Sequence, residues 1–196
     1  MSDAHIILAS NSPRRRELLE QAGIAYVSDP ADVDESILPG ESPEVYAVRL
    51  ALAKAAETAS RYADGRVLGA DTIVVVGGEI LGKPASLEDA ARMLTMLSGR
   101  SHNVITGVAL VDASDGRSMM GCETTEVRFR ELSASEIEDY VATGEPMDKA
   151  GGYGIQGRAS VFVEGITGCF FNVVGLPLAR VWKMLREVGV ATFTSN

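Results

Sequence analysis

The stretch that decides the fold is Val67-Leu68-Gly69-Ala70-Asp71-Thr72, which continues as Ile73 to Val76. Its two apolar runs predict a buried strand that carries a carboxylate and a hydroxyl between them. Gly77-Gly78 follows and predicts a two-residue hairpin turn, because glycine adopts positive φ at both positions without steric cost. A returning strand is therefore expected over Glu79 to Leu81.

The predicted hairpin is expected to bring Lys83 back toward Asp71. A carboxylate that lies among apolar residues and faces a lysine is costly unless the pair binds something. The alternative is an aspartate that begins a turn and a lysine that is simply solvated. This stretch alone does not choose between a functional site and ordinary loop chemistry.

A second motif lies near the start of the chain. Ile6 to Ala9 predicts a short strand, and a helix is expected after it, with Ser12 as N-cap, Pro13 at the first helical position and Gly23 just past the end. Arginines 14–16 oppose the dipole of that helix, whose N-terminus is already its positive end. Free N–H groups, serine hydroxyls and guanidinium groups together predict an anion site, most naturally for phosphate. The alternative is an exposed basic patch without a ligand.

A third motif is the stretch from Glu145 to Gly157, which has four glycines within its last seven residues. This composition suggests a backbone that approaches a ligand closely. The loop is not a Walker A motif, because no Gly-Lys-Ser/Thr ends it before a helix.

Two other features leave alternatives open. The acidic loop from Asp29 to Glu35 is expected to be mostly solvated, with one or two carboxylates available to a divalent metal. His102 near the start of a predicted strand is a candidate for catalysis, although a lone histidine there is more often structural.

The remaining periodic segments alternate between helices and strands. The expected helices run from Ser42-Pro43 to Tyr62, from Ser86 to Ser98, from Ser133 to Gly144 and over Leu178–Val188, and the expected strands cover Tyr26–Val27, Arg100–Val111, Ser118–Phe129 and Ala159–Val163. Residues 191–196 are expected to fray. There is no internal repeat and no low-complexity linker, so we expect one domain over residues 1–196.

Composition excludes several classes of protein. The 196 residues are 46% hydrophobic and 23% charged, which is typical of a globular chain. The net charge of −9 argues against a nucleic-acid partner but not against a nucleotide. Cys122 and Cys169 match no metal spacing and are expected to be buried thiols, with a disulfide as the minor alternative. No apolar run approaches ~18 residues and no signal peptide precedes the first strand, so we expect no membrane partner and a cytoplasmic protein.

Several separated motifs together resemble one family. They are Leu8-Ala9-Ser10-x-Ser12-Pro13-Arg14-Arg15, Gly69-Ala70-Asp71-Thr72, Gly82-Lys83-Pro84, Leu97-Ser98-Gly99-Arg100-x-His102 and Asp148-Lys149-Ala150-Gly151-x-Tyr153-Gly154-Ile155-Gln156-Gly157. The chain resembles the Maf family of nucleoside triphosphate pyrophosphatases from about residue 6 to 187. The Gly-Ile-Gln-Gly sequence and the closing Asn-Val-Val-Gly-Leu-Pro resemble the branch that acts on dTTP and UTP, whereas the 7-methyl-GTP branch has Glu at the position of Gln156.

This resemblance implies a fold and a reaction. The implied fold is α/β, an elongated Maf/inosine-triphosphatase-like architecture in which helices flank a twisted mixed sheet and two lobes border a central cleft. The implied enzyme hydrolyses dTTP, UTP and related pyrimidine or modified nucleotides to nucleoside monophosphate and pyrophosphate, which keeps unwanted nucleotides out of nucleic acid. A divalent metal, Mg²⁺ or Mn²⁺, and a homodimer are also implied.

The resemblance also assigns site residues. It implies Asp71 as the catalytic proton acceptor and Arg14, Thr72 and Gln156 as residues linked to substrate specificity. Weaker assignments place six further polar residues in or near the cleft, namely Ser10, Arg15, Glu35, Lys54, Lys83 and Lys149.

The chemistry expected of these side chains agrees with those roles. The arginines would bind phosphate oxygens bidentately and the lysines would act as point charges. Asp71, with Glu35, would hold the metal or orient the attacking water, and the sequence does not decide which role dominates.

The base-reading role falls to Gln156, whose amide carries both a donor and an acceptor and therefore suits the paired O4 and N3–H edge of uracil or thymine. Two alternatives remain. One is the same reaction on another base, and the other is a non-catalytic nucleotide-binding regulator of septum formation or cell division.

Overall fold

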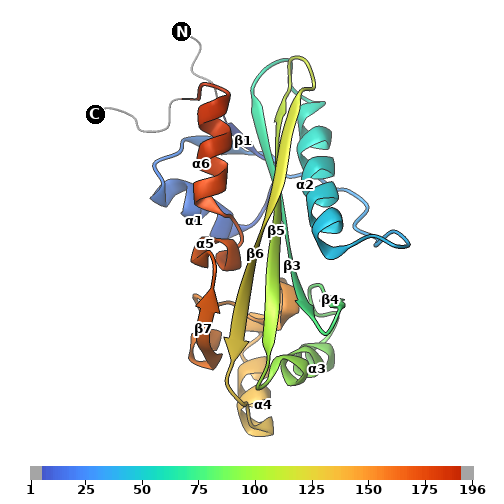
Figure 1. Cartoon of the computed structure of the whole chain (residues 1–196), viewed down its shortest axis with the longest axis vertical. Coiled ribbons are helices and arrows are strands. Elements are labelled where there is room, and N and C mark those ends of the chain that lie inside the picture. The colour runs from blue at the N-terminus through green and yellow to red at the C-terminus, as the bar shows by residue number, and fades with distance from the viewer. Residues whose placement is uncertain (1–5, 191–196) are drawn as a thin grey trace. The chain divides into compact units, whose positions relative to one another are not determined.

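The chain forms an α/β fold in which helices flank a mixed sheet of seven strands, as seen in a computed structural model that describes residues 6–190 (Figure 1). The strands are β1 (Ile6–Leu8), β2 (Tyr26–Ser28), β3 (Arg66–Val76), β4 (Glu79–Leu81), β5 (Ser101–Asp112), β6 (Ser118–Phe129) and β7 (Val163–Thr167). The α-helices are α1 (Pro13–Gln21), α2 (Pro43–Ala59), α3 (Leu87–Leu97), α4 (Ala134–Ala142), α5 (Phe170–Val174) and α6 (Leu178–Glu187). Three 3₁₀ helices are η1 (Glu145–Asp148), η2 (Ala150–Gly152) and η3 (Arg158–Phe162).

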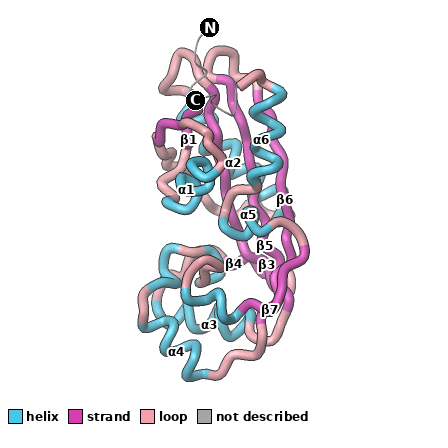
Figure 2. The backbone as a smooth tube through the Cα atoms, turned by 90° about the vertical axis from the view of Figure 1, so that its left-hand side faces the viewer, coloured by secondary structure: helices cyan, strands magenta, loops and turns pink. Residues whose placement is uncertain are grey.

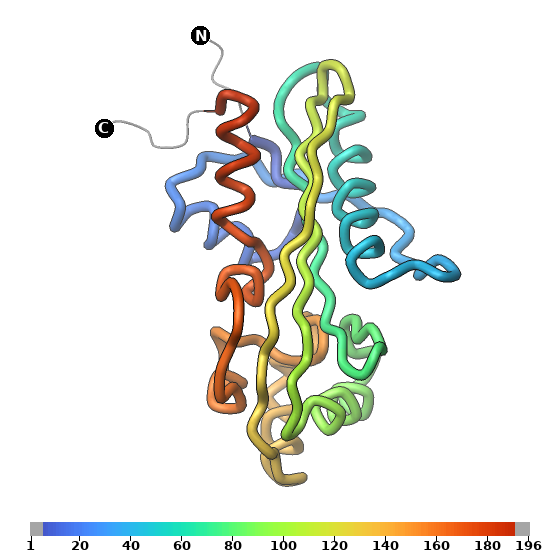
Figure 3. The backbone as a smooth tube through the Cα atoms, viewed as in Figure 1, coloured from blue at the N-terminus to red at the C-terminus, as the bar shows by residue number. Residues whose placement is uncertain are grey.

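The sheet combines parallel and antiparallel pairs. Its strand order is β2-β1-β3-β5-β6-β7, with β4 paired to β3 outside this path. β1 runs parallel to both β2 and β3, while β3 pairs antiparallel with β4 and β6 pairs antiparallel with β7. The long neighbours β5 and β6 are joined by one short turn and can be followed side by side in Figure 3. The predicted mixed α/β sheet is therefore confirmed.

The chain divides into two compact units, called unit 1 and unit 2. Unit 1 contains the described residues up to Asp71, Thr106–Glu123 and those from Gly175 onward, and unit 2 contains Thr72–Ile105 and Thr124–Val174. The division passes through β3 between Asp71 and Thr72. The elongated shape, the central cleft and the single domain over residues 1–196 stay predictions.

In unit 1, α2 packs directly on the backbone of two strands (Figure 1). A Cβ atom at Gly69 of β3 would collide with the carbonyl oxygen of Ala51 and would lie 2.8 Å from the amide nitrogen of Ala55. A Cβ atom at Gly107 of β5 would collide with the carbonyl of Ala47. The sequence has glycine at both strand positions because the helix approaches the strands at backbone distance.

In unit 2, the core gathers β3–β6 side chains with α3 and α4, which lie side by side (Figure 2). Phe129 of β6 is its largest fully buried side chain, and it packs edge-to-face against Tyr153 at 4.7 Å and against His102 at 5.0 Å between ring centroids. Edge-to-face contacts of this kind stabilise a core beyond the area they bury. The loop that carries Tyr153 is therefore anchored to the core of unit 2.

Local signals in the sequence set the helix starts correctly. Ser12, Ser42, Ser86 and Ser133 are the N-caps of α1–α4, and each side chain accepts a hydrogen bond from the backbone amide three residues later. Ser133 forms the full capping box with Glu136. The Gly77-Gly78 turn has φ values of 59° and 86°, and the predicted hairpin is confirmed.

Several expectations were wrong or lie outside the described residues. Ala159 to Val163 is not a strand, because residues 158–162 form η3 and the strand follows as β7. Cys122 and Cys169 are free thiols, as expected, but they are half-buried rather than buried. The prediction of fraying at 191–196 lies outside the described residues. Among residues 6–190, no helix is long and apolar enough to cross a membrane.

Candidate functional site

The centre of the candidate site is a carboxylate pair joined by one lysine, all within unit 1. Lys54 Nζ lies 2.6 Å from Asp71 Oδ1 and 2.6 Å from Glu35 Oε1. The Lys54 and Asp71 side chains are 14% and 12% exposed, whereas Glu35 is 58% exposed. The buried half of this arrangement carries most of its electrostatic energy, because solvent screens the exposed half.

The geometry of β3 and α2 explains how these groups meet. Successive strand residues point to opposite faces, so Asp71 shares the face of Gly69, which α2 covers. Lys54 lies on α2 four residues after Leu50 and eight after Tyr46, so the three occupy one side of the helix. The predicted lysine at Asp71 was Lys83, from the hairpin. The structure places Lys54 of the helix against Asp71, and the approach of Lys83 stays a prediction.

Tyr46 is a contributor that the sequence analysis missed. Its hydroxyl donates a 2.7 Å hydrogen bond to the carbonyl oxygen of Glu35, and its side chain is buried. Burial, followed by the charges of Asp71 and Glu35, raises the pKa of Tyr46. The spacing of four residues from Tyr46 to Leu50 to Lys54 was the signal available in the sequence.

Burial controls the protonation of Asp71. Desolvation raises its pKa above the ordinary value, while Lys54 and, more weakly, Arg15 oppose that rise. A carboxyl group whose pKa lies above the usual range is a stronger base when ionised than an exposed aspartate. The site therefore suits proton acceptance by Asp71.

Part of the predicted anion site makes hydrogen bonds within the protein itself. Arg15 is buried, and its Nε donates to the carbonyl of Gly175 at 2.9 Å while Nη1 donates to Ser10 Oγ at 3.1 Å. Desolvation lowers the pKa of Arg15, and the nearby charge of Asp71 opposes that effect. Arg14 is half-buried beside it. Ser10 and Arg15 thus form one buried polar cluster, and the charge of Asp71 acts on the Arg15 guanidinium group.

The acidic loop contributes one carboxylate to the cluster. Asp29 accepts hydrogen bonds from Arg61 and Tyr62, and Asp34 accepts from Ser36, so only Glu35 among these three contacts Lys54. Within residues 6–190, no group of three or more His, Cys, Asp or Glu side chains is arranged to hold a metal. Two carboxylates around one cation nevertheless fit Mg²⁺ or Mn²⁺, which commonly takes one or two protein carboxylates and completes its shell with water and phosphate oxygens.

Unit 2 holds the remaining predicted residues. Thr72 lies on the opposite face of β3 from Asp71, and shares its face with Val74, against which Gly151 packs. Lys83 is exposed just after β4. The backbone amide of Gly151 donates to the carbonyl of Gly82 at 3.0 Å, so the glycine-rich loop is tied to the residue before Lys83.

Packing within the protein explains why this loop has glycine at several positions. A Cβ atom at Gly151 would lie 2.8 Å from Val74 Cγ2, and one at Gly154 would lie 2.6 Å from Lys149 Cε. A Cβ atom at Gly157 would overlap the carboxylate of Glu145. Lys149 itself binds the carbonyl of Glu145 at 2.7 Å and Asp148 Oδ1 at 2.6 Å. This backbone thus lies close to the protein's own side chains, and its approach to a ligand stays a prediction.

His102 has the structural role that was weighed against a catalytic one. It is buried, and its Nε2 lies 2.7 Å from the hydroxyl of Tyr153. Burial lowers the pKa of His102 to about 4, so the ring is neutral at physiological pH. The histidine therefore helps to fix the loop that carries Tyr153.

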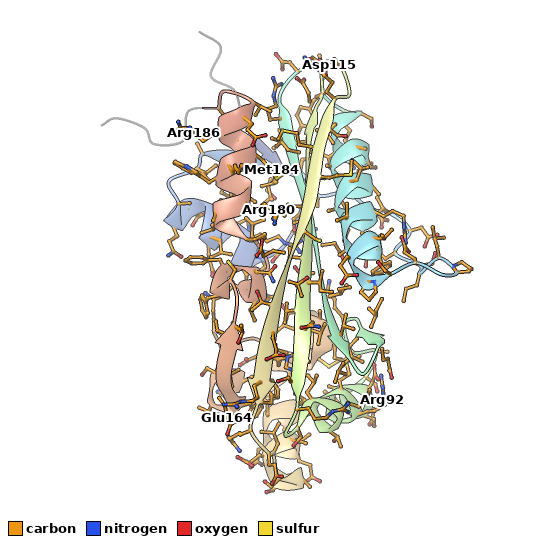
Figure 4. The ribbon with its side chains drawn as sticks, viewed as in Figure 1. Arg92, Asp115, Glu164, Arg180, Met184 and Arg186 are labelled. Carbon is orange, nitrogen blue, oxygen red and sulfur yellow. The ribbon has the colours of Figure 1, made fainter. Side chains whose placement is uncertain are left out.

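Ion pairs elsewhere in each unit are of a different kind. Arg180 of α6 contacts Glu123 at 2.9 Å, and Arg92 of α3 contacts Asp89 at 2.9 Å. The two arginines are labelled in Figure 4. The two arginine side chains are 41% and 49% exposed. Exposed pairs contribute at most about 1 kcal/mol each, so they are surface features rather than candidate sites.

Comparison with known proteins gives a consistent result over almost the whole chain. A protein named dTTP/UTP pyrophosphatase from Symbiobacterium thermophilum is 54% identical over 191 residues, which cover 97% of each chain. A second protein of that name, from Geobacter sulfurreducens, is 50% identical over 189 residues, covering 96% of this chain and 99% of its own. A solved nucleoside-triphosphatase / dITP/XTP pyrophosphatase from Mycobacterium abscessus aligns at 18% identity over 65% of this chain and 75% of its own, with a TM-score of 0.41, a likeness too low to assign a fold.

The family assignment rests on a match of similar extent. The Maf-like protein family matches residues 5–188, a span that includes every predicted site residue in both units. Together with relatives that share half of their residues with this chain, the match shows that the chain belongs to the Maf family.

Proposed function

We propose that this protein hydrolyses dTTP, UTP and related pyrimidine or modified nucleotides to nucleoside monophosphate and pyrophosphate. The observation that carries the proposal is the buried Asp71, whose pKa is raised by burial and whose Oδ1 is bound by Lys54. The relatives named dTTP/UTP pyrophosphatase support the substrate class. Such hydrolysis would remove unwanted nucleotides before they are incorporated into nucleic acid.

The proposed reaction is attack of water on the α-phosphorus. A bond forms between the water oxygen and the α-phosphorus, the bond from that phosphorus to the bridging oxygen breaks, and pyrophosphate leaves. Asp71 Oδ2 accepts the proton of the water, while Lys54 keeps Oδ1 in place. Lys54 and Arg15 offset the negative charge that develops on the phosphate oxygens.

Asp71 and Glu35 are the carboxylates that would hold Mg²⁺ or Mn²⁺. The metal would neutralise phosphate charge, as it does in other phosphoryl-transfer sites. One carboxylate cannot be both the sole base and the sole metal ligand, so metal affinity and proton transfer are measured separately to assign the role of Asp71.

Substrate recognition is proposed on the family resemblance. Arg14, Thr72 and Gln156 are assigned to specificity, Ser10 lies in or near the cleft, and the charges of Arg14 and Lys83 suit phosphate oxygens. Gln156 is exposed at the tip of its loop, which suits a residue that reads a base edge. A carboxylate in its place would offer acceptors only, so Gln156→Glu should weaken the use of dTTP and UTP relative to other bases.

The test is pyrophosphate release from dTTP, UTP, CTP, GTP and 7-methyl-GTP with Mg²⁺ and with Mn²⁺. We expect release from dTTP and UTP, and its loss in Asp71→Asn, which keeps the size of the side chain and removes its charge. Release that survives unchanged in Asp71→Asn would contradict the role of Asp71. Nucleotide binding without any release would contradict the enzyme and leave the regulator of septum formation.

Two further proposals are a homodimer, which the family resemblance implies, and a cytoplasmic location, which the sequence composition suggests. The homodimer is tested by light scattering of the purified protein during size-exclusion chromatography, where a single-chain mass would contradict it. The cytoplasmic location is tested by fractionation of cells, where recovery with membranes would contradict it.

A further inference from the structure

Gln156 is presented by a tight turn. The amide of Gly157 donates to the carbonyl of Gly154 at 3.0 Å, which makes Ile155 and Gln156 the two central residues of a four-residue turn. Gln156 is exposed, and η3 begins two residues later at Arg158. The direction of the Gln156 side chain therefore depends on what holds this turn in shape.

One carboxylate, that of Glu145, holds the turn. Its Oε1 and Oε2 accept from the backbone amide of Arg158 at 3.1 Å and 3.2 Å. Oε1 also accepts from the hydroxyl of Tyr140 at 3.1 Å. An amide at the start of a helical turn has no partner within the helix, so Glu145 supplies the acceptor from 13 residues away.

The turn is packed around the same carboxylate. A Cβ atom at Gly157 would overlap Glu145 Oε1 and lie 2.7 Å from Glu145 Cδ, and a Cβ atom at Gly154 would lie 4.0 Å from Oε1. The carboxylate thus fills the space that a side chain would take at Gly157, while Lys149, whose Nζ binds the carbonyl of Glu145, fills that space at Gly154. Removing the carboxylate deletes a hydrogen-bond acceptor and the packing beneath Gln156 at once.

We propose that Glu145 is a positioning residue for Gln156 and, through it, sets the preference of the enzyme among nucleobases. The inference rests on the proposed function, in which Gln156 reads the base. Glu145 touches neither the substrate nor the reacting atoms. Its effect is on the orientation of an amide whose donor and acceptor must both meet the base edge, and misplacing such an amide loses selectivity.

The experiment measures kcat/KM for dTTP and for CTP and takes their ratio. Because both substrates are measured on one preparation, the ratio does not depend on how much of the protein is folded. We expect the ratio to fall roughly tenfold in Glu145→Ala, in line with the loss of about one well-placed hydrogen bond. Glu145→Asp should fold readily and should show the same direction of change, because its carboxylate is one methylene too short to reach the amide of Arg158.

Two variants serve as controls. Glu145→Gln keeps an acceptor oxygen for the Arg158 amide and should restore most of the wild-type ratio. Glu136→Ala removes a carboxylate of unit 2 that caps α4 and whose pKa is lowered to about 2, chiefly by Arg130. It should lower the melting temperature without changing the ratio. A wild-type ratio in both Glu145→Ala and Glu145→Asp would overturn the inference.

A double variant shows whether Glu145 acts through Gln156. We expect Glu145→Ala to leave the ratio unchanged when it is added to Gln156→Glu, because the amide that Glu145 positions is already absent. Independent, additive effects would overturn the inference.

The failure of the proposed function looks different from the failure of this inference. Absence of pyrophosphate release from the wild type would sink both. A wild-type ratio in Gln156→Glu would contradict the base-reading role of Gln156 and, with it, this inference. The proposed hydrolysis would be unaffected. A changed ratio in Gln156→Glu together with a wild-type ratio in the Glu145 variants would sink this inference alone.

Discussion

At the scale of single residues, the contact between Lys54 and Asp71 is expected to set the pH range in which the site is active. Lys54 opposes the rise in the Asp71 pKa that burial causes, so Lys54→Met should raise that pKa further. If ionised Asp71 is required, the acid limb of the pH profile of kcat/KM moves to higher pH. At pH 7 we expect a loss of roughly 10²-fold, as for other removed charge-stabilising groups.

The matched control is Lys183→Met, because Lys183 is an exposed lysine on α6. It should keep the wild-type profile. An acid limb at the same pH in Lys54→Met and wild type would show that Lys54 does not control the ionisation of Asp71.

His102 makes folding sensitive to acid. Its pKa is about 4 in the folded protein and about 6.5 when unfolded. Between these values the unfolded chain binds a proton that the folded chain does not, so stability falls as pH decreases from 6.5 toward 4. At pH 5 this group alone should cost about 2 kcal/mol of unfolding free energy relative to pH 7.

Urea unfolding at the two pH values measures this effect. His102→Gln should lose less stability than wild type between pH 7 and pH 5. Tyr153→Phe removes the hydroxyl but keeps the histidine, and should retain the wild-type difference. Equal pH dependence in His102→Gln and wild type would contradict the assignment.

Residue types near the site were predictable from the sequence, but their partners were not. Asp71 stood out because a carboxylate interrupts an apolar run. Its contact with Lys54 joins a strand to a helix 17 residues earlier, and nothing local to either residue records it. The same holds for Glu145 and Arg158.

At the scale of elements, the packing of α2 on β3 places Lys54 beside Asp71. Gly69→Ala would drive a Cβ atom into the backbone of α2 at Ala51 and should destabilise the protein by about 1–3 kcal/mol. It should also lower kcat, because the helix that carries Lys54 must shift. Thermal unfolding and pyrophosphate release check the two effects.

Gly165→Ala is the control for this change. Gly165 lies in β7, and a Cβ atom there meets nothing within 4 Å. The variant should keep wild-type activity and stability or gain slightly, because alanine restricts the unfolded chain. Equal behaviour of the two variants would contradict the close packing of α2 on β3.

Elements with local signals were predictable, and those held by distant contacts were not. The serine N-caps predict the starts of α1–α4, and the paired glycines predict the β3–β4 hairpin. The 3₁₀ helix η3 was predicted as a strand because its residues are apolar and partly β-branched. Its first amide is held by the side chain of Glu145, so the helical turn wins over local propensity.

At the scale of the whole molecule, charge limits the partners. The net charge of −9 predicts repulsion from polyanions, whereas a small phosphate site needs only a few local cations. Duplex DNA added in excess, with free Mg²⁺ held constant, should leave the rate of pyrophosphate release from dTTP unchanged. Inorganic pyrophosphate should slow the reaction as its product. Inhibition by DNA would contradict the prediction that nucleic acid is not a partner.

The turn that presents Gln156 has a consequence for protein engineering. Gln156 is exposed, and the turn that carries it is held by contacts of Gly154, Gly157 and Glu145. A combinatorial library confined to positions 155 and 156 should therefore yield many folded members with altered base preference. Libraries that also vary Gly154, Gly157 and Glu145 should yield mostly inactive clones. Base selectivity can therefore be changed at positions 155 and 156 without rebuilding the turn that carries them.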